Sequence, residues 1–297
     1  MPNLKSLRNR IRSVGNTRQI TKAMKMVAAA KLRRSQERAQ ATRPYSRGMG
    51  LMIQSIASMA NEDSAPPLLA APKGKRVCIA IFTADRGLCG SFNSGVIRSV
   101  RSRVVALQNQ GMDVSLVCIG TKGRDVLKRQ FGDLIKRTHI GIAKDLNYEK
   151  AEREVSSKLL VEFEKGEFDV CMMVYNEFKS AISQELTWRQ IIPMPVDEVK
   201  KEDDDEEGYP AGAPYYEPDE ADVLNVLLPQ NVTVQVFQAL VESDASEHGS
   251  RMTAMDNAVR NAGDMLNKLN ITYNRTRQAV ITTELMEIIS GSESLKG

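Results

Sequence analysis

Apolar residues recur at helical spacing at both ends of this 297-residue chain, whereas its middle alternates strand-like and helix-like segments. Near the start they lie three and four residues apart, as in the seam of a coiled coil: Leu4, Leu7, Ile11 and Val14. After Gly15 the phase shifts to a second stripe, formed by Ile20, Met24, Val27, Ala28 and Leu32. The pattern predicts a long coiled-coil helix over residues 1–60, bent or locally broken at Pro44.

The last segment, residues 219–297, carries a more regular seam. Seven successive positions at three- and four-residue spacing are filled by Met252, Met255, Val259, Ala262, Leu266, Leu269 and Tyr273. We expect this helix to begin near Asp219 and Glu220, acids that suit the positive end of a helix dipole, with its main part starting at Pro229. A chain that begins and ends in long helices can fold them back on each other, so we predict an antiparallel coiled coil.

Residues 76–195 predict a different architecture, because continuous apolar runs alternate there with amphipathic stretches. We expect strands at 77–82, 114–119, 135–140 and 170–175, a further extended segment at 181–195, and helices at 94–108, 123–131 and 148–165. Alternation of this kind is typical of a parallel, doubly wound sheet covered by helices. The predicted fold class is therefore α/β, with a long antiparallel coiled coil of the terminal helices and a central Rossmann-like domain.

Charge is unevenly distributed behind a net charge of +4. Residues 1–60 contain 13 lysines and arginines and one acid, Glu37. This basic end indicates either a solvated helix face or an acidic partner surface, nucleic acid or anionic lipid. Residues 197–222 contain 12 acids, six of them in the unbroken run Glu202–Glu207. Since like charges repel, we expect residues 196–218 to form an acidic flexible insert.

The cysteines and the hydropathy of the chain predict the redox state of its compartment and how it associates with membranes. Cys78, Cys118 and Cys171 lie in or near apolar runs without metal-ligand spacing, which predicts buried thiols in a reducing compartment, whereas Cys89 lies in a glycine-rich turn and is less certain. Residues 1–30 lack the apolar core of a signal peptide. No apolar run reaches the roughly 20 residues that span a bilayer. We therefore expect membrane association through the surface or through other proteins.

Motifs for catalysis are sparse. The chain has no GxxxxGK[ST] loop, and Gly87–Gly90 lacks the GxGxxG spacing, so a tight turn is favoured over a nucleotide site. His139 lies in an apolar strand, where a core histidine is expected, and His248 is assigned to a polar helix face. Two such histidines predict neither a zinc cluster nor a catalytic triad. We expect a non-catalytic chain with no cofactor or metal.

Two strings at opposite ends of the chain resemble one family. The segment Ile11–Arg34 resembles the start of the γ subunit of F-type ATP synthase, and Arg277–Gly291 resembles that family's signature I-T-x-E-x-x-E-x-x-x-G, with Ser292 where the family has alanine. Shorter stretches also look like family landmarks: Gly87–Gly90, Val174–Asn176 and Tyr216–Asp219. The resemblance extends over nearly the whole chain.

The resemblance implies a central rotor shaft that couples proton-driven turning of a membrane c-ring to conformational changes in the catalytic β subunits. Implied partners are the α and β subunits, ε and the c-ring, at the cytoplasmic face of a bacterial inner membrane. It places the following residues at the contact with the α/β collar: Met24, Lys25, Arg251, Arg277, Gln278, Thr282, Glu284 and Glu287. It places Tyr216 and Glu217 at the foot, near the c-ring and ε.

Two other functions remain open from the residues alone. The basic N-terminal segment is compatible with a nucleic-acid-binding coiled coil, although it lacks interleaved aromatic residues. The central α/β pattern is compatible with a Rossmann-type enzyme that carries helical arms. Steep salt dependence of DNA binding would favour the first, and tight nucleotide binding the second.

Overall fold

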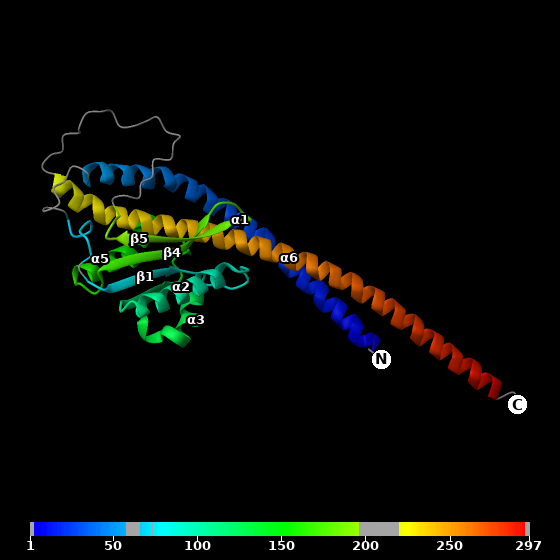
Figure 1. Cartoon of the computed structure of the whole chain (residues 1–297). Coiled ribbons are helices and arrows are strands. Elements are labelled where there is room, and N and C mark those ends of the chain that lie inside the picture. Colours follow the sequence, from blue (N-terminus) through cyan, green and yellow to red (C-terminus); the bar gives the residue numbers. More distant parts are fainter. Residues whose placement is uncertain (1–2, 58–65, 73, 196–219, 295–297) are drawn as a thin grey trace. The chain divides into compact units, whose positions relative to one another are not determined.

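The computed structural model describes residues 3–57, 66–72, 74–195 and 220–294. The chain divides into two compact units, one of residues 1–29 with 251–297 and the other of residues 30–250. Helices α1 (Leu4–Ala57) and α6 (Glu220–Ser294) contribute to both units (Figure 1). The acidic insert predicted at 196–218, with Tyr216 and Glu217, lies outside the described residues.

A five-stranded sheet organises the larger unit, with strand order β3-β2-β1-β4-β5. Its strands are β1 (Arg76–Phe82), β2 (Asp113–Ile119), β3 (Ile135–His139), β4 (Val170–Phe178) and β5 (Gln184–Ile192). Strands β1 to β4 pair in parallel, and β5 pairs antiparallel with β4. The predicted parallel sheet is confirmed for four strands, and the extended segment expected at 181–195 contains an antiparallel edge strand.

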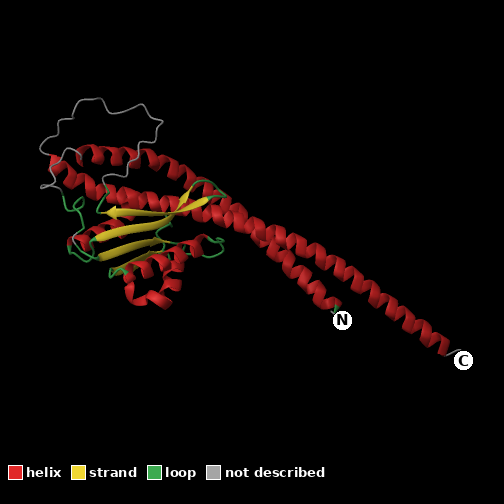
Figure 2. Ribbon diagram, viewed as in Figure 1, coloured by secondary structure: helices red, strands yellow, loops and turns green. Residues whose placement is uncertain are grey.

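Helices cover both faces of this sheet (Figure 2). Helices α2 (Phe92–Asn109) and α3 (Thr121–Phe131) pack on one face. On the other face lie α5 (Ser157–Glu164), the short α4 (Tyr148–Ala151) and the parts of α1 and α6 that belong to this unit. The π-helical turn Glu152–Ser156 separates α4 from α5, so the single helix expected at 148–165 is divided.

Strand β1 shows why its sequence is continuously apolar. Val77, Ile79 and Ile81 contact the α2–α3 layer, and Cys78 and Phe82 contact the opposite layer. Successive side chains of a strand point to opposite faces, so a strand buried on both faces must be apolar at every position. The core of the larger unit therefore consists of two layers that share one sheet.

Helix α6 begins at Glu220, as expected, but Pro229 does not mark a separate start, and Pro44 does not break α1. Each proline removes one backbone hydrogen bond, but packing on both sides offsets that loss. Around Pro44, Arg43 donates to Glu242 at 2.9 Å and Ser46 to Gln238 at 2.6 Å.

The cysteines and histidines complete the core. All four cysteines, including Cys89, are buried and form no disulfide. His139 is buried, as expected, but the surface assignment of His248 is wrong, because it is 8% exposed and lies 3.5 Å from Asp244. Among the described residues, no helix combines the length and apolar character that crossing a bilayer requires.

Candidate functional site

The smaller unit contains an antiparallel pair formed by the first part of α1 and the last part of α6. Arg8 donates to the Tyr273 hydroxyl at 2.8 Å, and Lys25 donates to Asp256 at 2.6 Å. The two residue numbers in each pair add to 281. A constant total is what antiparallel pairing in one register requires, so the predicted coiled coil is present and its alignment is fixed.

Asp256 forms ion pairs with two cationic side chains, one from each helix of the pair. It accepts hydrogen bonds from Lys25 on α1 and from Arg260 one turn further along α6. These two cations, Lys25 first, lower the pKa of Asp256 below its usual value. The family resemblance selected Lys25 but not Asp256, although an acid directly after the seam residue Met255 was an available signal in the sequence.

The predicted seam of α6 faces α1. None of its seven positions from Met252 to Tyr273 is fully exposed, and Met255 and Ala262 are buried. On α1 the prediction is only partly right. Met24 is half-buried and Ala28 is buried, but Ile20 and Val27 are 60% and 57% exposed. These two side chains lie on the outer surface of the pair.

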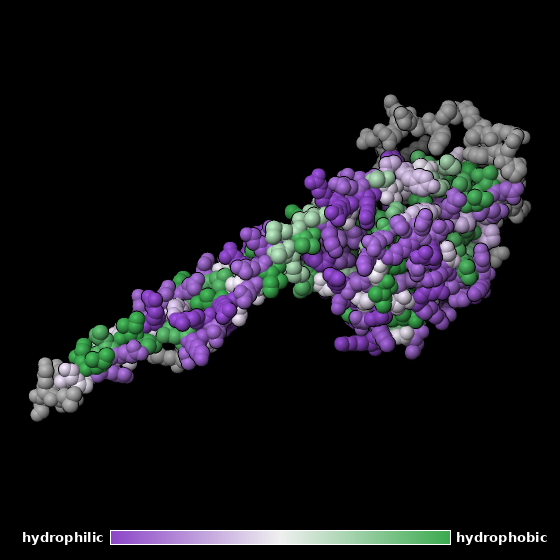
Figure 3. Space-filling model, turned by 180° about the vertical axis from the view of Figure 1, so that it is seen from behind, coloured by the Kyte–Doolittle hydropathy of each residue, from purple (hydrophilic) through white to green (hydrophobic). Residues whose placement is uncertain are grey.

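Helix α6 continues past the start of α1. In this register Leu4, where α1 begins, lies opposite Arg277, so residues 278–294 have no counterpart in α1. Large apolar side chains are exposed there: Ile281, Leu285, Met286, Ile288 and Ile289. Figure 3 shows this apolar surface near the C-terminal end of α6. Contiguous exposed apolar surface of this kind marks an interaction site.

The candidate contact residues fall into two groups. Met24, Lys25 and Arg251 are half-buried within the helix pair. The others are exposed on the last part of α6: Arg277, Gln278, Thr282, Glu284 and Glu287. Thr282 donates to the Gln278 carbonyl at 2.9 Å, whereas Arg277, Glu284 and Glu287 form no ion pair with any described residue. Their charges therefore remain available to a partner.

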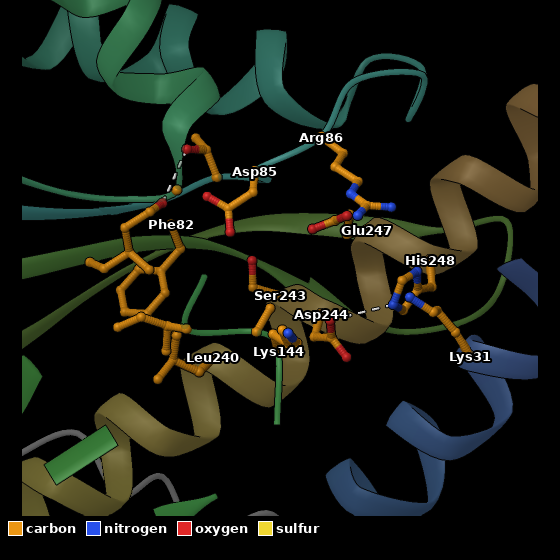
Figure 4. A pocket seen from close by; sticks show the side chains of 15 residues that line it. Lys31, Phe82, Asp85, Arg86, Lys144, Leu240, Ser243, Asp244, Glu247 and His248 are labelled. Atoms are coloured by element: carbon orange, nitrogen blue, oxygen red, sulfur yellow. Dashed lines mark hydrogen bonds and ion pairs between the residues drawn. The ribbon is translucent and has the colours of Figure 1, made fainter. Parts of the chain in front are cut away.

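The larger unit has a hollow of about 310 Å³ at the carboxyl ends of β1 and β2 (Figure 4). Charged side chains of both signs line it in equal numbers: Lys31, Arg86 and Lys144, and Asp85, Asp244 and Glu247. Asp85 accepts from the backbone amides of Thr121 and Gly141, and Arg86 and Glu247 point toward each other. The formal charges of these six side chains sum to zero.

A serine, an aspartate and a histidine meet beside this hollow. Ser35 donates to one oxygen of Asp244 at 2.5 Å, and His248 lies 3.5 Å from the other. A nucleophilic triad needs the histidine between the serine and the acid. Here the acid occupies the central position, so His248 cannot take the Ser35 proton directly. Among the described residues, no three histidine, cysteine or acidic side chains are grouped to hold a metal ion.

Comparison with known proteins gives one consistent result. A family model described as ATP synthase matches residues 3–295. An ATP synthase gamma chain of Magnetococcus marinus is 55% identical over the full length of both chains. The ATP synthase gamma chain of Paracoccus denitrificans is 50% identical over 99% of this chain and all of its own.

Solved structures show the same architecture. A chain from the central stalk and c-ring of Tetrahymena thermophila mitochondrial ATP synthase is 28% identical, with a TM-score of 0.60 over 80% of this chain and 99% of its own. A chain of Euglena gracilis mitochondrial ATP synthase covers 98% of this chain and 94% of its own, with a TM-score of 0.71. At 22% identity, the Euglena chain supports the fold alone.

Proposed function

We propose that this chain, which belongs to the family of ATP synthase gamma chains, is the rotor shaft that couples a proton-driven c-ring to the catalytic β subunits. One observation carries the proposal beyond family membership. Helix α6 extends beyond the antiparallel pair and exposes both apolar and unpaired charged side chains over residues 278–292. Such a surface suits a protein collar that surrounds it.

Transmission of torque requires that the shaft resist twisting. The seam from Met252 to Tyr273 and the Lys25–Asp256 ion pair join the two helices at several levels. A pair joined in this way bends and twists less than a single helix. Because its surface differs from side to side, each β subunit meets a different face as the shaft turns. Nucleotide affinity at each site then follows from differential contact with the shaft.

We assign the collar contact to the residues selected by the family resemblance: Met24, Lys25, Arg251, Arg277, Gln278, Thr282, Glu284 and Glu287. We assign Tyr216 and Glu217, with the acidic insert 196–218, to the foot that meets ε and the c-ring. In this proposal residues 1–60 and 219–297 form the shaft and residues 76–195 the Rossmann-like domain beside it. The α, β and ε subunits and the c-ring are the proposed partners.

The proposed chain is not itself catalytic and lies peripherally at the cytoplasmic face of a bacterial inner membrane. One observation supports this view: in the Ser35–Asp244–His248 group the acid, not the histidine, lies between the other two side chains. The nucleic-acid-binding alternative gains no support from the comparisons, which are to ATP synthase chains.

Co-purification and coupled synthesis together test the function. A tagged full-length chain, produced in its own cells and extracted with mild detergent, should bring down α, β, ε and the c-ring. Membranes depleted of the chain should lose proton-driven ATP synthesis and regain it when the chain is supplied. A chain that purifies alone from membranes that still make ATP without it contradicts the proposal.

A further inference from the structure

A second hollow lies at the carboxyl end of β3, the edge strand of the sheet. Its volume is about 300 Å³. The lining comes from β3, the loop that follows it, α4, the π-helical turn and α5: Arg137, Thr138, His139, Ile140, Ile142, Lys150, Glu154 and Lys158. In open α/β sheets the usual ligand position is the switch point of the strand order, which here lies between β1 and β4. The case for a ligand at β3 therefore depends on the side chains that line this hollow.

The lining is predominantly cationic. Arg137, Lys150 and Lys158 face one acid, Glu154. Lys158 lies 3.4 Å from Glu154, and Lys150 donates to the Gly141 carbonyl at 3.0 Å. Arg137 pairs with Glu162 through Nη2, while its Nη1 is buried without a hydrogen-bond partner among the described residues. The Nη1 donors of Arg137 are thus unsatisfied by the described residues.

Two titratable groups in the hollow have lowered pKa values. Burial is the main cause that lowers the pKa of His139 to about 4, and the charges of Lys158 and Arg137 act in the same direction. Hydrogen bonding and charge from Lys158, and then from Arg153, lower the pKa of Glu154. The neighbouring cations therefore favour the less positive form of each group. His139 is therefore neutral near pH 7 and adds no charge to that of the cationic side chains.

We propose that this hollow binds a small phosphate-type oxyanion, either free phosphate or a compact phosphate monoester. Arginine and lysine are the side chains that bind such groups, arginine through paired N–H donors. A volume near 300 Å³ is at the lower end of the range for ligand pockets, and no phenylalanine, tyrosine or tryptophan side chain lines the hollow. The site therefore accommodates a phosphate with a small substituent and offers no platform for a nucleotide base.

Binding has a consequence for His139. A dianion beside the ring stabilises the imidazolium, so the pKa of His139 rises when the site is filled. The groups facing His139 in this hollow are Arg137, Lys150, Glu154 and Lys158. Of these groups, His139 and Glu154 have shifted pKa values. The rise in the His139 pKa, rather than affinity at low pH, is the readout of binding, because a phosphate monoester itself takes up a proton at about pH 6.

The chain offers a direct probe, because it contains only two histidines, His139 and His248. We would follow the Cε1–H resonances of both by NMR in the full-length chain, assigned with His248→Gln. Inorganic phosphate is titrated in one series and glycerol 3-phosphate in another, with sodium chloride keeping ionic strength constant. These two series separate free phosphate from a phosphate monoester. His248 serves as the internal control, since it lines the other hollow.

Three variants sharpen the test. Lys158→Gln should weaken phosphate binding about tenfold, and Glu154→Gln should strengthen it by removing a competing carboxylate. Lys128→Gln, an exposed lysine of α3 outside the hollow, should leave affinity unchanged. Circular dichroism confirms that each variant is folded.

The expected result is a saturable shift of the His139 resonance, with a raised His139 pKa and an unmoved His248. A shift that chloride reproduces, one that does not saturate, or equal affinities for Lys158→Gln and Lys128→Gln would overturn the proposal. The signal is read in the chain without its partners, so a negative result leaves the rotor function standing.

Discussion

Lys25 and Asp256, 231 residues apart in the sequence, form a 2.6 Å ion pair between the first and last helices. Together with the Arg8–Tyr273 hydrogen bond, this pair fixes the register of the two helices. The register then determines that α6 has no counterpart in α1 after Arg277. The extent of the surface proposed to meet the collar thus depends on the contacts that Asp256 and Tyr273 make earlier along α6.

Asp256→Asn should loosen this helix pair in a pH-dependent manner. Lys25 and Arg260 lower the pKa of Asp256 in the folded chain. A lowered pKa stabilises the fold above the unfolded value of about 3.9, and this contribution is lost as pH falls through the folded value. Thermal melts should show a lower midpoint for the variant at pH 7 and equal midpoints for variant and parent at pH values below the folded pKa.

Asp264→Asn is the matched control for that experiment, because Asp264 is exposed on the same helix and forms no ion pair with a described residue. Its melts should coincide with those of the parent at both pH values. If Asp256→Asn also matches the parent at pH 7, the ion pair does not stabilise the helix pair.

Glu242 should be among the most sensitive positions of the larger unit. It is 1% exposed, and it accepts from Arg43 at 2.9 Å and from the Phe178 amide at 3.0 Å. Glu242→Ala leaves a buried amide unpaired and removes the ion-pair partner of Arg43, which keeps its hydrogen bond to the Phe178 carbonyl. Since Arg43 is partly exposed, we expect the low end of the usual range, about 3 kcal/mol of unfolding free energy.

Chemical denaturation measures that loss, and Glu185→Gln is the control. Glu185 forms only a 3.7 Å surface pair with Lys179, so its replacement should change stability by less than about 0.5 kcal/mol. Similar losses for the two variants would show that Glu242 is not a structural anchor.

Gly120 and Gly141 form a pair of glycines that separates backbone strain from steric clash. Both have positive φ, +97° at Gly120 and +72° at Gly141. A Cβ at Gly120 would lie 2.0 Å from the Thr83 carbonyl oxygen, whereas one at Gly141 meets nothing within 4 Å. Gly141→Ala should cost about 1 kcal/mol from strain alone, and Gly120→Ala at least ~3 kcal/mol. Equal losses in urea denaturation would contradict the clash.

Regular spacing made part of this fold predictable. The α6 seam repeats without interruption from Met252 to Tyr273, so its buried side follows directly from the sequence. On α1 the apolar stripe changes phase near Gly15, and spacing alone does not determine which side of the helix packs against α6. The structure covers the face with Met24 and Ala28 and leaves Ile20 and Val27 exposed.

Tertiary arrangement explains what could not be predicted. Pro44 and Pro229 are tolerated because neighbouring side chains pack or bond across helices, which local propensity does not describe. The cationic hollow gathers Arg137 from a strand, Lys150 from a short helix and Lys158 from another. No single motif contains these residues, so the sequence pattern gave no indication of them. Of the candidate site, family resemblance supplied the exposed residues, and periodicity did not single them out.

Glu284→Lys and Glu287→Lys should disturb energy coupling more than folding. Both side chains are exposed on the part of α6 beyond α1 and form no ion pair with a described residue. Reversing their charge should therefore change the stability of the chain by no more than about 0.5 kcal/mol. At a protein collar, however, the new positive charge would meet groups arranged for a negative one, and like-charge contacts oppose binding.

Membranes carrying either variant should show reduced proton-driven ATP synthesis with normal amounts of assembled complex. Lys268→Glu is a suitable control, because Lys268 is also exposed on α6 but lies within the helix pair and outside the proposed contact set. It should retain coupled synthesis near the parent level. If both glutamate variants synthesise ATP at that level, neither residue contributes to the collar contact, and the unpaired charges of α6 serve solubility rather than coupling.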